Sequence, residues 1–169
     1  VSYTFVSSEF TDGSGEFKPS SWDFGHILNL VAAKQFKKNW ELGIKWRYQG
    51  GGPYTPYDVG TSSIKEIWDV NQSGLPDNAQ LNNQRLPASH GLDIRVDKRY
   101  FFDKWTLNVY LDIENLYAAK IESTPYLDVE RDESGQAIED PNDPSRYLTK
   151  EVRNISTTVL PSLGVMIEF

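Results

Sequence analysis

Charged side chains recur at even spacings in three stretches of the chain, where they could form a catalytic, metal-binding or ion-pairing surface. The nine residues are Glu41, Lys45, Arg47, Asp93, Arg95, Asp97, Arg99, Asp112 and Glu114. Alternate side chains of a strand share a face, so Asp112 and Glu114 would point the same way, as a catalytic carboxylate pair must. Nothing else in the neighbouring sequence assembles a site around them, so we expect no catalytic residues and no enzyme.

Metal-binding residue types are also present but poorly arranged. Asp128, Glu130 and Asp132 have the spacing of a calcium loop, yet Glu133 stands where that loop requires glycine. The chain has no cysteine, which excludes disulfides and thiolate metal sites, and its two histidines are His26 and His90. We therefore expect no metal and no cofactor, and we expect the acidic cluster to be part of a solvated surface loop.

Composition limits the partners of this chain. Its 169 residues suggest one domain, and the formal net charge of -7 argues against a nucleic-acid partner. Aromatic residues make up 13% of the chain, and five of them fall in segments without a sustained period. They could stack on a sugar or an aromatic ligand, or they could pack the loops against each other, and the sequence favours neither. These five are Tyr54, Tyr57, Trp68, Tyr126 and Tyr147.

The elements that position these residues are recognisable by their alternation. From residue 39 to 50, Trp40, Leu42 and Ile44 alternate with polar or small residues, and the pattern lasts long enough for a tilted strand to cross a bilayer. Similar patterns predict six strands, at about 1–8, 22–36, 39–50, 90–102, 105–117 and 161–169. The long segments at about 50–89 and 118–160 are expected to be loops, the second with a hairpin over 126–138 through Ser134-Gly135.

Short and long connections alternate between these strands, as in an outer-membrane barrel with short periplasmic turns and long extracellular loops. The fold class expected is all-β, an antiparallel transmembrane β-barrel segment with the charged residues facing the lumen. Six strands would leave two open edges in lipid, so we expect further strands from a longer protein or a companion chain. The alternative is a secreted β-sandwich that binds carbohydrate, which would fold alone without detergent.

Several stretches in order resemble the C-terminal end of TonB-dependent receptors of the Bacteroidetes type. The resemblance spans most of the chain outside the loop between Ala118 and Thr158. It rests on Ser2-Tyr-Thr-Phe5, Pro19-Ser-Ser-Trp-Asp23, His26-Ile-Leu-Asn-Leu30, Trp40-Glu-Leu-Gly-Ile44, Gly51-Gly-Pro-Tyr-Thr-Pro56, Arg85-Leu-Pro87, His90-Gly-Leu-Asp93, Asp112-Ile-Glu-Asn-Leu-Tyr117 and Leu160-Pro-Ser-Leu-Gly164 ending in Phe169.

The resemblance implies a barrel of twenty-two strands with a plug in its lumen, of which these six strands would be the last. It implies energy-coupled uptake of a scarce, bulky nutrient (siderophore, oligosaccharide, cobalamin or peptide) across the outer membrane of a Gram-negative bacterium. The nine charged residues would then contact the plug or line a hydrated wall. A passive porin or structural barrel remains the rival.

The implied partners follow from the same resemblance. They are membrane lipid, the remaining strands and plug, and the TonB complex, which would act through an N-terminal region outside this sequence. The aromatic Phe169 on an amphipathic last strand resembles the signal read by barrel-assembly machinery. A surface lipoprotein is a further candidate partner.

Overall fold

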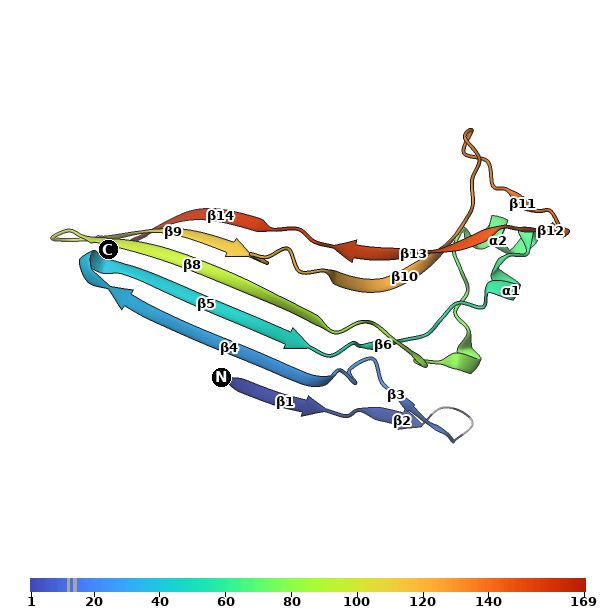
Figure 1. Ribbon diagram of the computed structural model, residues 1–169, viewed down its shortest axis with the longest axis horizontal. Helices are drawn as coiled ribbons and strands as arrows, with labels where there is room; N and C mark the ends of the chain where they lie inside the picture. The colour runs from blue at the N-terminus through green and yellow to red at the C-terminus, as the bar shows by residue number, and fades with distance from the viewer. Residues whose placement is uncertain (12, 14) are drawn as a thin grey trace.

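The computed structural model describes residues 1–11, 13 and 15–169 and shows one antiparallel sheet extended by smaller elements (Figure 1). The sheet has six strands in the order β1-β4-β5-β8-β9-β14, so each pairs with its neighbour along the chain among these six. Their bounds are β1 Ser2–Val6, β4 Gly25–Phe36, β5 Trp40–Gln49, β8 Ser89–Phe101, β9 Thr106–Glu114 and β14 Leu160–Glu168. The expected all-β, antiparallel class is confirmed.

Several strand ends differ from those expected: β1 ends at Val6 and β9 at Glu114, before the expected residues 8 and 117. Strand β4 begins at Gly25 rather than near residue 22, because Gly25 has a positive φ of 68° and the preceding residues form a turn in which the Phe24 amide donates to the Trp22 carbonyl. Strand β14 begins at Leu160 and includes Pro161. It lies at the edge of the sheet, where a proline without an N–H is tolerated.

Two short turns close one end of the sheet. The 3-10 turn η1 (Lys37–Asn39) joins β4 to β5, and the Phe102 amide donates to the Trp105 carbonyl between β8 and β9. Lys38 and Asn39 both have φ near 61°, a region that asparagine enters more readily than lysine. We call this end, residues 36–40 and 100–106, the turn rim.

The opposite end carries the small elements (Figure 1). They are β2 (Glu9–Thr11) paired with β3 (Phe17–Pro19), β6 (Pro53–Tyr54) paired with β7 (Gln84–Arg85), β10 (Ile121–Val129) paired with β13 (Thr149–Ser156), β11 (Glu139–Asp140) paired with β12 (Asp143–Tyr147), the helices α1 (Val59–Ser62) and α2 (Lys65–Asn71), and the 3-10 turn η2 (Asn78–Gln80).

The segment from 118 to 160 is therefore not an irregular loop, and that expectation was wrong. Strand β10 pairs with the distant β13 across a register shift between Ser123 and Tyr126, and this bulge, next to Pro125, interrupts the alternation in the sequence. The turn at Ser134-Gly135 exists, but it closes only a small hairpin whose bridge joins Arg131 to Ala137.

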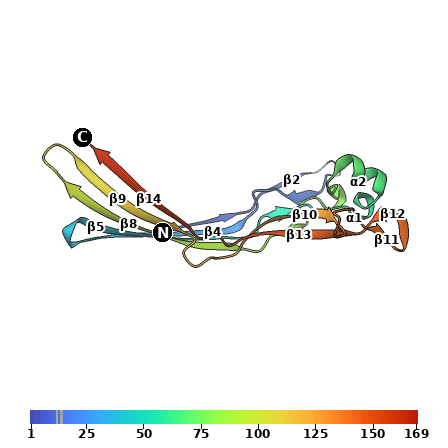
Figure 2. The same ribbon diagram turned by 90° about the horizontal axis from the view of Figure 1, so that it is seen from above.

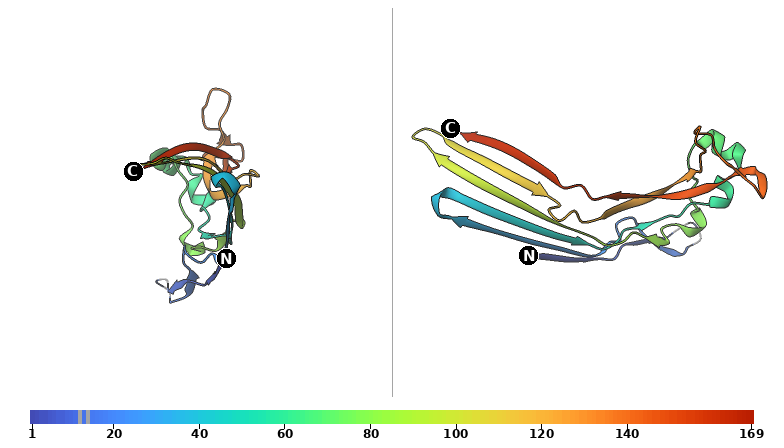
Figure 3. Two further views of the ribbon diagram at one scale, coloured as in Figure 1. Left: turned by 90° about the vertical axis from the view of Figure 1, so that its left-hand side faces the viewer. Right: turned by 45° about the horizontal axis from the view of Figure 1, so that its top comes forward.

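Buried apolar residues lie outside the six-stranded sheet. Trp68, Leu127 and Val129 form the core of the loop end, with Tyr57 and Tyr147 packed on it. In the described part of the chain no second layer covers the six-stranded sheet, and Figures 2 and 3 show it as a single curved layer. No helix among the described residues is long and apolar enough to cross a membrane.

Candidate functional site

All nine charged residues predicted to share one surface lie on the same face of the sheet. The strand register pairs Lys45 with Asp93 and Arg95 with Asp112, and directly opposed residues of an antiparallel pair point to the same side. We call this side the polar face. Its charged members are Glu41, Lys45, Arg47, Asp93, Arg95, Asp97, Arg99, Asp112 and Glu114, together with Glu168 on β14.

Ion pairs cross the strands of the polar face. Arg47 lies 3.0 Å from Asp93, and Arg99 lies 3.1 Å from Glu41. Both arginines are about half exposed, so each pair contributes at most about 1 kcal/mol. These contacts mainly fix the register and reduce the net charge of the face, and they leave it open to a polar partner or to water.

The most buried charge on this face belongs to Asp97, which is 6% exposed. Its carboxylate accepts two hydrogen bonds from Arg95, at 2.9 and 3.0 Å, and a third at 2.8 Å from the Asn108 amide. The Arg95 guanidinium lies 3.9 Å above the Tyr110 ring, and that ring covers Gly164 so closely that an added Cβ would lie 2.2 Å from it. This cluster locks β8, β9 and β14 together.

Sequence reasoning missed Asn108, Tyr110 and Gly164 as members of this cluster. The signal was present, because an aromatic side chain directly opposite a glycine on a neighbouring strand commonly covers it. This pairing could be recognised only from the strand register, which places Gly164 opposite Tyr110. Asp112 and Glu114 share the face but sit along a single strand, in an arrangement that suits a charged wall rather than a catalytic pair.

Small residues in the middle of the polar face leave a hollow of about 270 Å³. Ala33 and Gly43 form its floor, and Lys45, Asp93 and Glu114 stand on its border. Side chains of both signs beside a small-residue floor can receive a polar loop of another protein segment.

The opposite side of the sheet is apolar and uncovered, and we call it the apolar face. Leu42, Ile44, Leu107 and Val165 all lie on it and none is buried; Val165 is 62% exposed. A soluble sandwich would bury such a face under a second sheet. Exposed to water, this surface would be an aggregation site, so lipid or another protein segment is needed to cover it.

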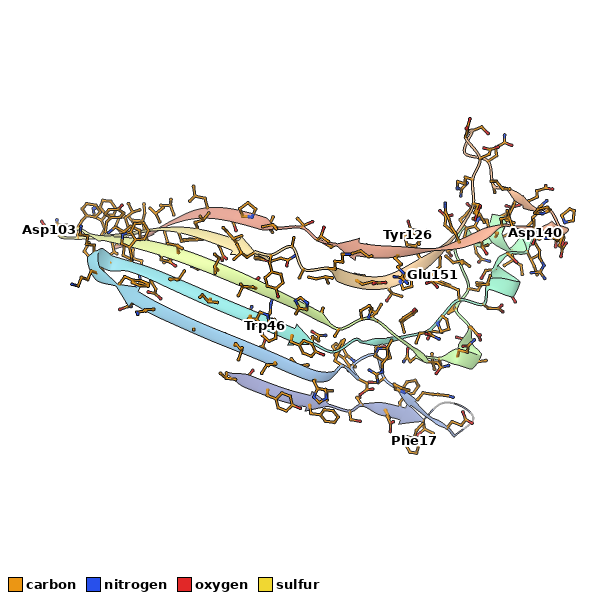
Figure 4. All side chains as sticks on the ribbon, viewed as in Figure 1. Phe17, Trp46, Asp103, Tyr126, Asp140 and Glu151 are labelled. Atoms are coloured by element: carbon orange, nitrogen blue, oxygen red, sulfur yellow. The ribbon has the colours of Figure 1, made fainter. Side chains whose placement is uncertain are left out.

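Aromatic residues gather at both ends of the apolar face. At the turn rim the rings of Phe102 and Trp105 stack at 4.1 Å, and Figure 4 shows many rings beside Asp103. Phe169, next to this rim, is fully exposed. The other residues of this group are Phe36, Trp40 and Tyr100, whereas Phe101 lies at the same rim on the polar face, paired with Thr106.

At the loop end, aromatic residues hold both histidines. Tyr3 contacts His26 at 2.8 Å, and Tyr117 contacts His90 at 2.7 Å while accepting a bond from Trp46. His26 and His90 are therefore hydrogen-bonded members of this aromatic border. In the described residues no group of three acidic or histidine side chains could hold a metal ion.

Three of the five aromatic residues considered as ligand contacts pack the loops instead. Trp68 is only 3% exposed between Leu127 and Val129, so it has no free face for a ligand. The Tyr57 hydroxyl donates to the Pro125 carbonyl and the Tyr147 hydroxyl to Asp69. Burial excludes ligand stacking for Trp68, whereas Tyr57 and Tyr147 are half-buried and pack against the core of the loops.

The remaining two aromatic candidates, Tyr54 and Tyr126, keep exposed surface. Tyr126 is about half exposed on β10, where Figure 4 labels it near Glu151. Burial raises the pKa of the Tyr54 phenol, and the charges of Glu151 and Glu122 raise it further. The raised pKa keeps the Tyr54 phenol protonated, so its hydroxyl can donate a hydrogen bond.

The two long loops form one body, which we call the loop module (residues 56–77 and 121–156). Arg146 donates to the Gly60 carbonyl and, at 2.8 Å, to the Ser63 hydroxyl, while Tyr147 N donates to the Ser63 carbonyl. An ion pair between Lys65 and Glu139 adds a second link. The two long segments are thus ordered relative to each other.

The link between sheet and loop module depends on Asn115, which sequence reasoning also missed. Its φ of 53° ends β9, and its side chain accepts from the Ala119 amide and donates to the Ala119 and Thr158 carbonyls. Its own amide donates to Asp93 on the polar face. The sequence did carry a signal for this role: an asparagine, which favours turns, directly follows the last alternating residue in Glu-Asn-Leu-Tyr (residues 114–117).

Acid is expected to loosen the loop module before it affects the sheet. Hydrogen bonds from Thr61, Ser134 and Ser145 lower the pKa values of Asp58, Asp132 and Asp143 below 3.8. Since a lowered folded-state pKa means that the unfolded chain binds protons more readily, this stability is present above 3.8 and is lost as the pH falls further. Amide hydrogen exchange across this range should show earlier loss of protection around residues 58–61, 132–136 and 143–145 than in β4 and β5.

Asparagine at these three positions provides the control. Asp58→Asn, Asp132→Asn and Asp143→Asn together should remove most of the acid dependence of exchange in the loop module. Unchanged acid dependence in that triple variant would contradict the assignment to these carboxylates.

Comparisons with known proteins name no relative: no protein-family model, no curated protein and no solved structure matches this chain.

Proposed function

We propose that this chain forms the last six strands of a twenty-two-stranded barrel in a TonB-dependent outer-membrane transporter of the Bacteroidetes type. The observation that carries the proposal is the two-sided sheet: one face is apolar and uncovered, and the other carries ten charged residues, the nine predicted ones and Glu168. A wall between lipid and a wetted lumen needs this division. The chain would bind and pass a scarce, bulky nutrient and would make or break no bond.

The arrangement of turns and loops supports the same proposal. The short turns lie at one end of the sheet and the ordered loop module at the other (Figure 1). In a barrel this places the turn rim at the periplasmic side and the loop module outside, where it would take part in binding the nutrient, with Tyr54 and Tyr126 as the available aromatic contacts.

Three stretches that carry the family resemblance also meet in space. Arg85 donates to the Asp23 carbonyl and, at 3.1 Å, to the Gly51 carbonyl, and it forms an ion pair with the Asp23 carboxylate. An added Cβ at Gly51 would collide with the Leu86 carbonyl, so glycine is required there. These residues hold the loops against the ends of β4 and β5.

On this proposal the polar face seats the plug, and the hollow over Ala33 and Gly43 receives part of it. The plug, the other strands and the TonB contact would come from the rest of the protein or a companion chain. Phe169 would be read by the barrel-assembly machinery, and a surface lipoprotein would be a partner of the loops.

A passive porin is the second candidate, because several charges of the polar face already neutralise one another, as in the pairs Arg47–Asp93 and Arg99–Glu41. Such a wall can be stable in water without a plug. The purified full protein in a planar bilayer with potassium chloride distinguishes the two: a plugged transporter conducts little, whereas a porin conducts steadily.

Labelling of single cysteines tests the membrane location, and the chain has no native cysteine to interfere. In intact cells an impermeant maleimide should label Ser134→Cys in the loop module but not Lys104→Cys at the turn rim. After the outer membrane is opened, both should react. A chain that stays soluble and monomeric without detergent, with both positions labelled alike, would overturn the proposal and favour the secreted sandwich.

A further inference from the structure

Two lysines are the only charged residues among the paired strand positions on the apolar face, and both lie close to the turn rim. Lys34 shares this face because it is paired with Leu42, and Lys98 because it is paired with Trp40 and Val109. A charged side chain at lipid depth is costly unless its end reaches a polar layer. The presence of both lysines at the same end of the apolar face therefore points to a polar group that meets them there.

Aromatic rings hold these two lysines at the rim. Lys34 Nζ lies 5.5 Å from the centre of the Phe36 ring, and Lys98 Nζ lies 5.3 Å from Trp40 and 5.1 Å from Tyr100. Each ring is further toward the turns than the central apolar residues, so the ammonium groups point to the layer in which the aromatic border lies. Lys98 also donates to the Lys38 carbonyl in the turn.

The turns add three more cations at the same level. Lys37 and Lys38 form most of η1, and Lys104 lies in the turn between β8 and β9, where Asp103 is the one carboxylate. No carboxylate of the described residues forms an ion pair with Lys34 or Lys98. The two turns and the adjoining end of the apolar face thus hold five lysines and one aspartate, a positive band on a chain whose net charge is -7. Glu168 lies at the same level but on the polar face, paired with Thr106.

We propose that this band binds the phosphate of anionic phospholipid headgroups. The band consists of Lys34, Lys37, Lys38, Lys98 and Lys104, with the ring of Trp40 between Lys34 and Lys98. The inference rests on the proposed membrane location and adds the lipid class and the leaflet, the one at the turn side. Trp40 directly opposes both Phe36 and Lys98, and Lys34 is two residues before Phe36 on β4. One headgroup can therefore lie over Trp40 with an ammonium group on each side.

The loop end of the apolar face shows why the preference for anionic lipid belongs to the turn side alone. Its border is built from Tyr3, Tyr48 and Tyr117 with His26 and His90, and no lysine or arginine lies on the apolar face there. Hydrogen-bonded phenols and imidazoles suit an interface without selecting a charge. Cationic attraction to anionic lipid is thus confined to the turn rim, where each lysine contributes about a fivefold preference.

Native mass spectrometry of the full protein in mixed micelles of phosphatidylglycerol and phosphatidylcholine tests the inference. The protein should retain phosphatidylglycerol over phosphatidylcholine. In Lys34→Gln/Lys98→Gln this preference should fall about 25-fold, because each of the two lysines contributes about fivefold. The charge-matched control Lys120→Gln/Lys150→Gln, whose lysines are exposed at the loop end, should keep it.

Arginine substitution distinguishes the loss of charge from a folding defect. Lys34→Arg/Lys98→Arg keeps both charges and should restore the preference, and added salt should weaken it. Equal retention of the two lipids by the parent protein, or a preference that survives Lys34→Gln/Lys98→Gln, overturns the headgroup site alone. A parent protein that is monodisperse without detergent and retains neither lipid overturns the proposed function as well.

Discussion

Arginine in place of Ile44 should lower the stability of the protein in a bilayer by about 2–4 kcal/mol, the usual cost of this charge on the lipid face of a barrel near mid-membrane. Ile44 lies in the middle of β5 on the apolar face, directly opposite Ala32 and Ile94. No acidic residue occupies the paired strand positions of that face. The measurement is urea-induced unfolding of the full protein in lipid vesicles.

Val31 provides the matched control on the other side of the sheet. It is also a branched aliphatic residue at the same height, but it is paired with Lys45 on the polar face. Val31→Arg should change the stability by about 0.5 kcal/mol or less, because that face is wetted and rich in carboxylates. Equal losses in the two variants, or a larger loss in Val31→Arg, would mean that the apolar face is not the one that meets lipid.

Strand alternation made the sheet predictable. In the six segments the apolar and polar residues alternate closely enough that the period assigns the two faces, although Val31 falls on the polar face and Lys34 and Lys98 fall on the apolar face. The turns of two to four residues then specify which strands are neighbours. The nine charged residues could be placed together for this reason, since a shift of register by one residue would have moved Lys45 or Asp93 into the apolar face.

The loop module could not be predicted in the same way, because its order depends on contacts between distant segments. Trp68 is buried only because Leu127 and Val129, far along the chain, provide its surroundings. The bulge in β10 interrupts the only periodic signal of that region. Segments without alternation of apolar and polar residues are predicted to be loops. Without that alternation, the sequence also does not show whether their aromatic residues pack inward or face a ligand.

The two parts also differ in what stabilises them. The sheet has a continuous ladder of backbone hydrogen bonds but, among the described residues, no covered core. On the proposed function its stability depends on lipid against the apolar face. The loop module has a small buried core of its own and side-chain links such as Arg146 to Ser63. We therefore expect the two parts to lose structure independently.

Alanine in place of Trp68 is the sharpest test of that independence. Loss of this buried ring should destabilise the loop module by about 3–5 kcal/mol, the range measured for large aromatic residues in cores. Amide hydrogen exchange should then accelerate in α2, β10 and β13. Exchange in β4 and β5 should stay as in the parent, because Trp68 does not belong to the sheet and local unfolding can be confined to one cooperative unit.

Val70 supplies the control in the same helix, since its side chain is 82% exposed. Val70→Ala should leave exchange in the loop module within about 0.5 kcal/mol of the parent. If Trp68→Ala accelerated exchange equally in β4 and β5, the sheet and the loop module would be one cooperative unit. Unchanged exchange in β4 and β5 would instead show that the loop module can rearrange without disturbing the sheet, as the proposed function requires.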